Sequence, residues 1–312
     1  MTGVILTVTV NAALDVTYGV DDVDWDGVNR VRAVHRRAGG KGVNVARVLT
    51  ALGHEVLAAG LAGGPTGDAV LADLAAAGIP AAFTPIAGDT RTTLAVHTSR
   101  GATLFNEPGP VVAAEELARF LGAYERVLGR ASAVVISGSL PRGAPADFYA
   151  TLAAVASRHG VPAIVDADGA PLRHAPAGRP AVLKPNAEEL ARALRPGSAE
   201  AMEITAGARL LRDEGAGSVV VSLGADGVLA VTPEGTWRAR MPYRVEGNPT
   251  GAGDALVAGL ALGLVEGAPW PERLRRAAAL GAAAVATPVA GDFDPDVYRR
   301  VHPEITVEPH DP

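Results

Sequence analysis

An acidic residue, Asp254, follows a small-residue turn in the run 248–259 (NPTGAGDALVAG). The turn, Gly251, Ala252 and Gly253, opens into an apolar run that favours a buried helix starting near Asp254. Free backbone N–H groups at a helix start suit a phosphoryl group in transfer. A carboxylate gains nothing beside a phosphate that is only bound, but it can accept the proton of a hydroxyl that attacks phosphorus. The run therefore indicates either a catalytic base or an ordinary Asp helix N-cap.

The chain has only two lysines, Lys41 and Lys184, against 26 arginines. A compact ammonium and a planar guanidinium act differently at a phosphate, which makes both lysines candidate ligands. Lys41 follows two glycines at an expected helix start, but the next residue is Gly42 and not the Ser or Thr of a P-loop. Lys184 ends an expected strand, and Asn186 and Glu189, three residues apart, share a face just after it.

Polar and small residues also follow other expected buried strands, at the position where open α/β sheets bind ligands. Asp15 follows the apolar run 4–10, residues 137–141 (SGSLP) follow the run 134–136, and residues 166–169 (DADG) follow the run 162–165. Asp15 could hold sugar hydroxyls or lie in solvent, and the residues alone leave both readings open.

The elements that would position these residues alternate between strand and helix for most of the chain, which predicts an α/β sheet with helices on both faces. The turn 224–227 predicts a hairpin between the runs 218–223 and 228–231. We expect an edge strand at 237–241 and a loose tail at 308–312. Two segments, about 12–37 and 84–106, alternate like exposed strands and predict a small lid over the ends of the main sheet.

Composition excludes several functional classes. The chain has 312 residues, 48% of them hydrophobic but only 4% aromatic, which suits closely packed helices on a parallel sheet. The absence of cysteine excludes disulfides and thiolate chemistry. A net charge of -6 gives no global positive field for nucleic acid. With no apolar run long enough for a membrane span and no basic segment at the start, we expect a cytoplasmic protein without nucleic-acid or membrane partners.

Four motifs occur in the order seen in ribokinase-like sugar kinases of the phosphofructokinase B family: 39–47 (GGKGVNVAR), 137–141 (SGSLP), 184–189 (KPNAEE) and 250–254 (TGAGD). The chain resembles this family over nearly its whole length. The resemblance implies one ribokinase-like kinase domain over 1–312, a three-layer α/β sandwich with a mostly parallel central sheet and a small β lid.

Two further segments narrow the resemblance to the phosphosugar branch of that family. Residues 6–15 (LTVTVNAALD) are similar to the start of 1-phosphofructokinases, tagatose-6-phosphate kinases and minor 6-phosphofructokinases. Residues 103–109 (TLFNEPG) are similar to the 1-phosphofructokinase form of the second lid strand. The resemblance therefore favours an ATP-dependent kinase of fructose 1-phosphate, with tagatose-6-phosphate kinase or 6-phosphofructokinase as alternatives.

The resemblance also implies roles for individual residues. Asp254 would be the general base, and the turn of Gly251, Ala252 and Gly253 would form the anion hole. The expected sugar-phosphate ligands are Asp15, Gly40 and Asn44 for hydroxyls, with Lys41, Arg91 and Arg30 for the existing phosphate. The expected ATP ligands are Lys184, Asn186, Ser222, Gly224 and Gly227. Mg²⁺ would be held by Asn186 and Glu189, mostly through water.

Three departures from the branch pattern keep the substrate's identity open. Ala12 replaces the usual Pro after Asn11, Pro249 removes an N–H before the anion hole, and Asp168 adds a carboxylate. A catalytically silent sugar-phosphate binding protein is the alternative from another class, although it would not need Asp254 or the glycines. A dinucleotide-dependent oxidoreductase would need a glycine-rich turn where residues 11–13 (NAA) stand. The apolar face expected on the lid favours a homodimer.

Overall fold

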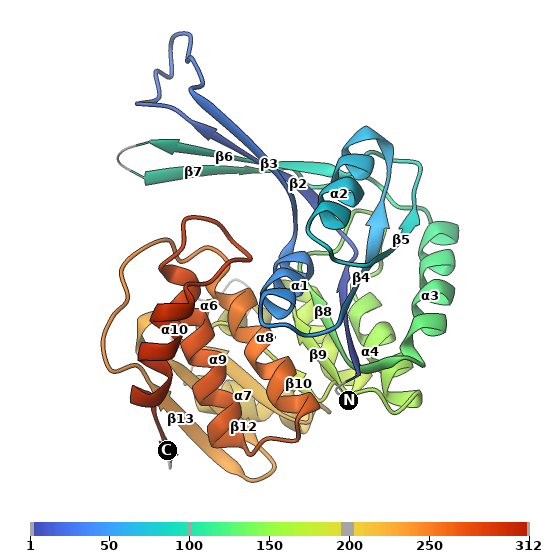
Figure 1. Cartoon of the computed structure of the whole chain (residues 1–312). Helices are drawn as coiled ribbons and strands as arrows, with labels where there is room; N and C mark the ends of the chain where they lie inside the picture. Colours follow the sequence, from blue (N-terminus) through green and yellow to red (C-terminus); the bar gives the residue numbers. More distant parts are fainter. Residues whose placement is uncertain (1–2, 99–100, 195–202, 311–312) are drawn as a thin grey trace.

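The computed structural model describes residues 3–98, 101–194 and 203–310. Among them, ten strands form one sheet in the order β14-β13-β12-β11-β10-β9-β8-β1-β4-β5 (Figure 1). Pairing is parallel from β5 to β11 and antiparallel from β11 to β14. The strands are β1 (Val4–Thr9), β4 (Val56–Ala62), β5 (Ala81–Pro85), β8 (Ala131–Ser137), β9 (Ala163–Asp166), β10 (Val182–Leu183), β11 (Val219–Ser222), β12 (Val228–Thr232), β13 (Gly235–Arg240) and β14 (Thr306–Pro309).

Helices cover both faces of this sheet, because its central strands are apolar on both sides. The helices are α1 (Lys41–Ala51), α2 (Gly64–Ala76), α3 (Ala114–Leu128), α4 (Phe148–Arg158), α5 (Gly169–His174), α6 (Ala187–Leu194), α7 (Ile204–Asp213), α8 (Ala252–Val265), α9 (Trp270–Val285) and α10 (Pro295–Val301). One apolar core contains buried residues of α1, α2, α8, α9 and α10, and the other contains those of α3 to α7. The predicted three-layer α/β sandwich is confirmed.

Small residues allow the helices of the first core to pack closely. A Cβ on Gly259 of α8 would lie 2.7 Å from the Ala277 Cα of α9, so only glycine fits at this crossing. The low aromatic and high alanine content of the chain therefore allows this close packing of helices. Within the described ranges, the helices fall short of the length and apolarity that a membrane-spanning segment needs.

A second, four-stranded sheet projects from the body beside the carboxyl end of β1 (Figure 1). Its order is β3-β2-β6-β7, where β2 is Ala13–Gly19, β3 is Ala33–Gly39, β6 is Arg91–Thr98 and β7 is Gly101–Asn106. Strands β2 and β6 pair in parallel and the outer pairs are antiparallel. This small sheet, called the lid below, leads from the end of β3 through Gly40 directly into α1, so the motif of residues 39–47 spans this junction.

The C-terminal prediction was wrong at one point. Instead of a loose tail at 308–312, β14 pairs with β13, so β13 is not the edge of the sheet. Ile305 is buried just before β14 and anchors it to the first core. Residues 311 and 312 of the expected tail lie outside the described residues. The hairpin between β11 and β12 is confirmed.

Candidate active site

The glycine turn before α8 has a backbone that other residues could not adopt easily. Gly251 is the N-cap of α8 with φ 87°, and a Cβ there would lie 2.8 Å from the Ala290 Cα. The amide of Ala252 donates to the Pro249 carbonyl over 3.2 Å. Among the described residues, the amides of Gly253 and Asp254 have no such backbone partner. The start of α8 therefore presents free donors to an anion.

Asp254 is the third residue of α8, since the helix begins at Ala252, two residues before the expected start. Its side chain is 6% exposed, and its Oδ2 accepts a hydrogen bond of 2.8 Å from Asn44 Nδ2. Burial raises the pKa of Asp254 to about 7; the Asp166 carboxylate adds to the rise, and Lys41 and Lys184 oppose it. A carboxyl group with this pKa can gain and lose a proton near neutral pH. The N-cap alternative is wrong, because Gly251 holds that position.

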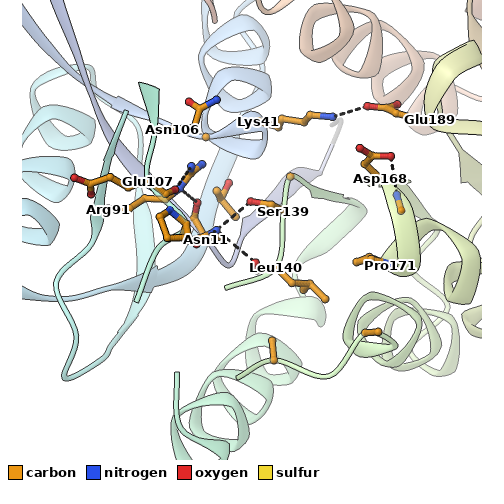
Figure 2. Close-up of a pocket in the computed structure, with 17 residues that line it drawn as sticks. Asn11, Lys41, Arg91, Asn106, Glu107, Ser139, Leu140, Asp168, Pro171 and Glu189 are labelled. Carbon is orange, nitrogen blue, oxygen red and sulfur yellow. Dashed lines mark hydrogen bonds and ion pairs between the residues drawn. The ribbon is translucent and has the colours of Figure 1, made fainter. Parts of the chain in front are cut away.

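The two lysines meet on one buried carboxylate that sequence reasoning did not select, Asp166 at the end of β9. Its Oδ1 is 3.3 Å from Lys41 Nζ and 3.2 Å from Lys184 Nζ. Burial disfavours the charged form of Asp166, but the two ammonium groups outweigh it and lower its pKa. Lys41 Nζ is also 3.5 Å from Glu189 Oε1 (Figure 2). The only sequence signal for Asp166 was an acid at the end of a buried strand.

A cavity of about 820 Å³ opens beside these charges (Figure 2). Four of the predicted ligands line it, namely Gly40, Lys41, Arg91 and Glu189. Other lining residues had no predicted role, although their segments had been singled out: Asn11, Asn106, Glu107, Ser139 and Asp168.

Arg91 and Asn11 connect the walls of the cavity. Arg91 donates to the carbonyl oxygens of Asn11 and Glu107 over 3.2 and 3.0 Å. Asn11 Nδ2 donates to Ser139 Oγ over 3.0 Å (Figure 2). These bonds bring the lid, the end of β1 and the end of β8 together around a single arginine cation, which suits a phosphorylated substrate.

The remaining predicted sugar ligands are divided between the cavity and the lid. Gly40 has φ 105°, and a Cβ there would lie 2.7 Å from Thr9 Cγ2. Asp15 lies on β2 opposite Arg37 of β3, where burial raises its pKa to about 6 although Arg91 opposes the rise. Arg30 is exposed on the loop between β2 and β3, and it does not line the cavity.

The predicted nucleotide ligands gather at the carboxyl ends of β10 and β11. Asn186 and Ser222 form a parallel bridge, and the Ser222 amide donates to the Pro185 carbonyl over 3.0 Å. Gly224 and Gly227 both have positive φ, 58° and 91°, in the turn that follows β11. Lys184 Nζ lies 3.6 Å from the position of a Cβ on Gly253, which brings the predicted nucleotide side to the glycine turn.

Asn186 and Glu189 are engaged with each other across the first turn of α6. The Asn186 amide donates to Glu189 Oε2, and the Glu189 amide donates to Asn186 Oδ1, each over 2.8 Å. Their remaining capacity suits contacts to a cation through water. Among the described residues, no three acidic or histidine side chains are grouped to hold a metal ion directly.

The site combines a carboxyl group whose pKa lies near neutrality, free helix amides and clustered ammonium groups under a lid. This combination suits the transfer of a phosphoryl group to a hydroxyl. The fold and site therefore define a phosphotransferase with a hydroxyl acceptor. Residues 9–296 match the pfkB family of carbohydrate kinases, and the chain belongs to that family. It is a sugar-phosphate kinase of the family, with ATP as the co-substrate.

Solved structures extend the match to the whole chain. Phosphofructokinase-2 from Escherichia coli, in complex with potassium, is 30% identical with a TM-score of 0.89, covering 97% of this chain and 99% of that one. The tetrameric inhibited form of that enzyme is 31% identical, with a TM-score of 0.88 and the same coverage. A possible 1-phosphofructokinase from Thermotoga maritima is 27% identical with a TM-score of 0.86, covering 99% of this chain and 100% of that one.

Proposed function

We propose that this chain is a 1-phosphofructokinase, which converts fructose 1-phosphate and ATP into fructose 1,6-bisphosphate and ADP. The observation that carries the proposal is the wall of the cavity at Asn106, Glu107 and Pro108. These residues belong to the segment 103–109, whose sequence resembles the 1-phosphofructokinase form. The carbonyl of Glu107 holds Arg91, so this segment is in contact with the cation proposed to bind the existing phosphate.

In this proposal the acceptor lies between the lid and α8. Asp15, Gly40 and Asn44 hold the sugar hydroxyls, Arg91 holds the existing phosphate and Asp254 faces the acceptor hydroxyl. We propose that Lys41, predicted to meet the existing phosphate, also serves the transferred group, a role that its pairing with Asp166 and Glu189 supports. Arg30 stays a prediction that would require the loop between β2 and β3 to approach the substrate.

The proposed reaction is an in-line transfer. The acceptor hydroxyl oxygen forms a bond to the γ-phosphorus while the bond from that phosphorus to the bridging oxygen breaks. The hydroxyl proton passes to Asp254, and the electron pair of the broken bond leaves with ADP. Negative charge spreads over the transferred group, and it is stabilised by the two lysines and by the amides of Ala252 and Gly253. The Ala252 amide becomes available for this once it is released from the Pro249 carbonyl.

ATP would lie along Lys184, Asn186, Ser222, Gly224 and Gly227, at the carboxyl ends of β10 and β11. We infer that Mg²⁺ accompanies it, held by Asn186 and Glu189 mostly through water. The ion would neutralise charge on the phosphate groups when bound. The capping bonds between the two residues fit this role, because they fix the side chains while leaving Glu189 on the cavity wall.

A second candidate is 6-phosphofructokinase activity, which the likeness to Escherichia coli phosphofructokinase-2 favours. Both reactions yield fructose 1,6-bisphosphate. The same two binding positions, one for each end of the sugar, would therefore serve either acceptor. The substrates differ in which end of the sugar already carries the phosphate. The cavity wall at 106–108 is therefore the place where the two acceptors would be distinguished.

The test is the initial rate of ADP formation from Mg-ATP with fructose 1-phosphate, fructose 6-phosphate and tagatose 6-phosphate supplied separately, against a blank without sugar. We expect the highest kcat/KM with fructose 1-phosphate. A preference for either 6-phosphate would overturn the substrate while keeping the kinase mechanism. Folded protein without turnover on any of the three would favour a silent binding protein.

We also propose that the chain is a single kinase domain whose lid, formed by about 12–37 and 84–106, makes a homodimer. Large apolar side chains on the lid are exposed in the single chain, among them Val31, Val34, Leu104 and Phe105. A trough of about 240 Å³ between Tyr18, Val31, Val96 and Phe105 lies on this sheet. Burial of such side chains against a second copy would remove apolar surface from water.

A further inference from the structure

The chain's two lysines, which are 143 positions apart, converge on one oxygen atom. Both ammonium groups lie within 3.3 Å of Asp166 Oδ1. The other carboxylate oxygen, Oδ2, accepts a hydrogen bond of 3.1 Å from Ser137 Oγ. The backbone around Asp166 is also fixed, because its carbonyl accepts the Gly138 amide over 3.0 Å. A single rigid carboxylate therefore fixes the positions of two cations.

Asp166 itself does not reach the substrate. Its side chain is 1% exposed, Lys184 is 3% exposed, and neither lines the cavity. Lys41 has a 38% exposed side chain and does line the cavity. The carboxylate lies behind the lysines, and any effect it has on the reaction must pass through them.

The two ammonium groups border the place proposed for the transferred phosphoryl group. Lys184 Nζ is next to Gly253, which lies in the first turn of α8. Lys41 Nζ is next to Glu189 on the cavity wall. Two cations this close repel each other, and the shared carboxylate offsets that repulsion. Without it, each flexible lysine stem would move its ammonium away from the other.

We propose that Asp166 is a positioning residue that holds both ammonium groups at the γ-phosphate, so that the site binds ATP more tightly than ADP. The inference rests on the proposed function only in placing ATP at this site. ADP lacks the group that both lysines would contact. Loss of the shared anchor should therefore weaken ATP binding selectively, whereas a general loss of structure would weaken both nucleotides.

Calorimetric titration of Asp166→Asn with ADP and with the non-hydrolysable β,γ-imido analogue of ATP tests this inference. We expect the affinity for the analogue to fall roughly tenfold or more, the size of a charge-assisted hydrogen bond, with ADP affinity almost unchanged. The matched control is Ser137→Ala, which removes a hydrogen bond from the same carboxylate but leaves both lysine contacts. An equal loss for both nucleotides, or no loss, overturns the proposal.

The pH profile gives a second readout that a purely structural role would not move. The Asp166 carboxylate contributes to the raised pKa of Asp254. In Asp166→Asn the acid limb of kcat/KM should therefore shift to lower pH while kcat decreases. An unshifted limb would contradict the electrostatic part of the inference.

Asp166→Asn leaves the buried Lys184 ammonium without its carboxylate, which can prevent folding. A second pair of variants, compared with each other, tests the proposal in that case. Lys184→Met and the double variant Lys184→Met/Asp166→Asn avoid that buried charge. The added Asp166→Asn change should lower the affinity for the analogue further, through Lys41, while ADP affinity stays the same. No difference between the two variants would overturn the proposal.

These binding measurements require no sugar. Wild-type protein that prefers the analogue over ADP but phosphorylates none of the three sugar phosphates would overturn the proposed substrate alone. Wild-type protein that binds both nucleotides equally would overturn the role of Asp166 even if fructose 1-phosphate were the substrate.

Discussion

Asp254 lies among charges of both signs, and their balance sets its proton affinity. Burial and the Asp166 carboxylate favour the protonated form, whereas Lys41, Lys184 and the hydrogen bond from Asn44 favour the ionised form. The resulting pKa of about 7 lets a carboxyl group act as a base toward a hydroxyl at neutral pH. An exposed aspartate with its ordinary pKa would be a weaker base for this proton.

We therefore expect kcat/KM to fall below a midpoint of about pH 7, because protonated Asp254 cannot accept the hydroxyl proton. Below that midpoint the rate should decrease about tenfold per pH unit. Asp254→Asn should lower kcat by roughly 10²- to 10⁴-fold while nucleotide binding is retained. Initial rates between pH 5.5 and 9 and a titration with ADP check this, and an unchanged kcat in the variant would remove Asp254 from the mechanism.

Thermal melting separates this loss of activity from unfolding. Because the pKa of Asp254 is raised in the folded state, that state binds the proton more tightly than the unfolded chain does. The group's contribution to stability is therefore present at low pH and is lost as pH rises toward about 7. At pH 8 Asp254→Asn should melt no lower than the wild type, since it no longer buries a charge.

Sequence reasoning selected Asp254, Lys41 and Lys184 because their types and neighbours carry information that needs no tertiary structure. It assigned no role to Asp166. The contact from Lys41 to Asp166 joins residues 125 positions apart, and nothing local in a run of Asp-Ala-Asp reveals it. The assignment of Lys41 to the sugar phosphate stays a prediction, since the motif identifies a cation but not the carboxylates that orient it.

The loop between α9 and α10 connects the lid to the glycine turn before α8. Its Ala290 packs under Gly251, and its Gly291 packs against Asn44. Asp292 of the same loop forms a two-pronged ion pair with Arg37 of β3, at 2.6 and 3.1 Å. One short loop thus touches the lid, the partner of Asp254 and the glycine turn.

Breaking this ion pair should affect substrate affinity more than stability. In Asp292→Asn we expect the KM for the sugar phosphate to rise several-fold, because β3 leads into Gly40 at the cavity. The free energy of unfolding should fall by only about 1 kcal/mol or less, as for other partly exposed pairs. The control is Glu308→Gln, which removes the exposed pair with Arg240 far from the site. Steady-state kinetics and urea unfolding measure both effects, and equal KM values in the two variants would contradict the coupling.

Element boundaries were predictable where a local pattern determined them. Buried strands were found as apolar runs, and the lid strands as alternating ones. The strand β14 was missed because a segment of only four residues, Thr306–Pro309, is defined by pairing with β13 and not by its own pattern. The start of α8 was placed two residues late, since a glycine N-cap in a left-handed conformation cannot be recognised from residue types alone.

At the scale of the whole molecule, positive charge is local and not global. The net charge is -6, yet Arg91 and Lys41 line one cavity, and Lys184 lies behind it on the buried Asp166 carboxylate. Negatively charged substrates would be attracted at the opening and not over the entire surface.

The layer order was predictable because alternation of strand and helix has few stable solutions. The proposed association of two copies depends on a surface that the fold leaves exposed.

The two faces of the lid differ, and the difference predicts how a dimer forms. Tyr18, Val96 and Thr103 are in register across β2, β6 and β7, so alternation places Phe105 on the same face and Leu104 on the other. The two side chains are similarly exposed, 47% and 48%, but only Phe105 lines the apolar trough. If the trough face joins the copies, Phe105→Asp should give monomers, whereas Leu104→Asp should stay dimeric. Sedimentation equilibrium distinguishes them: monomeric wild type or a dimeric Phe105→Asp variant would contradict this interface, and dissociation by Leu104→Asp alone would assign it to the opposite face.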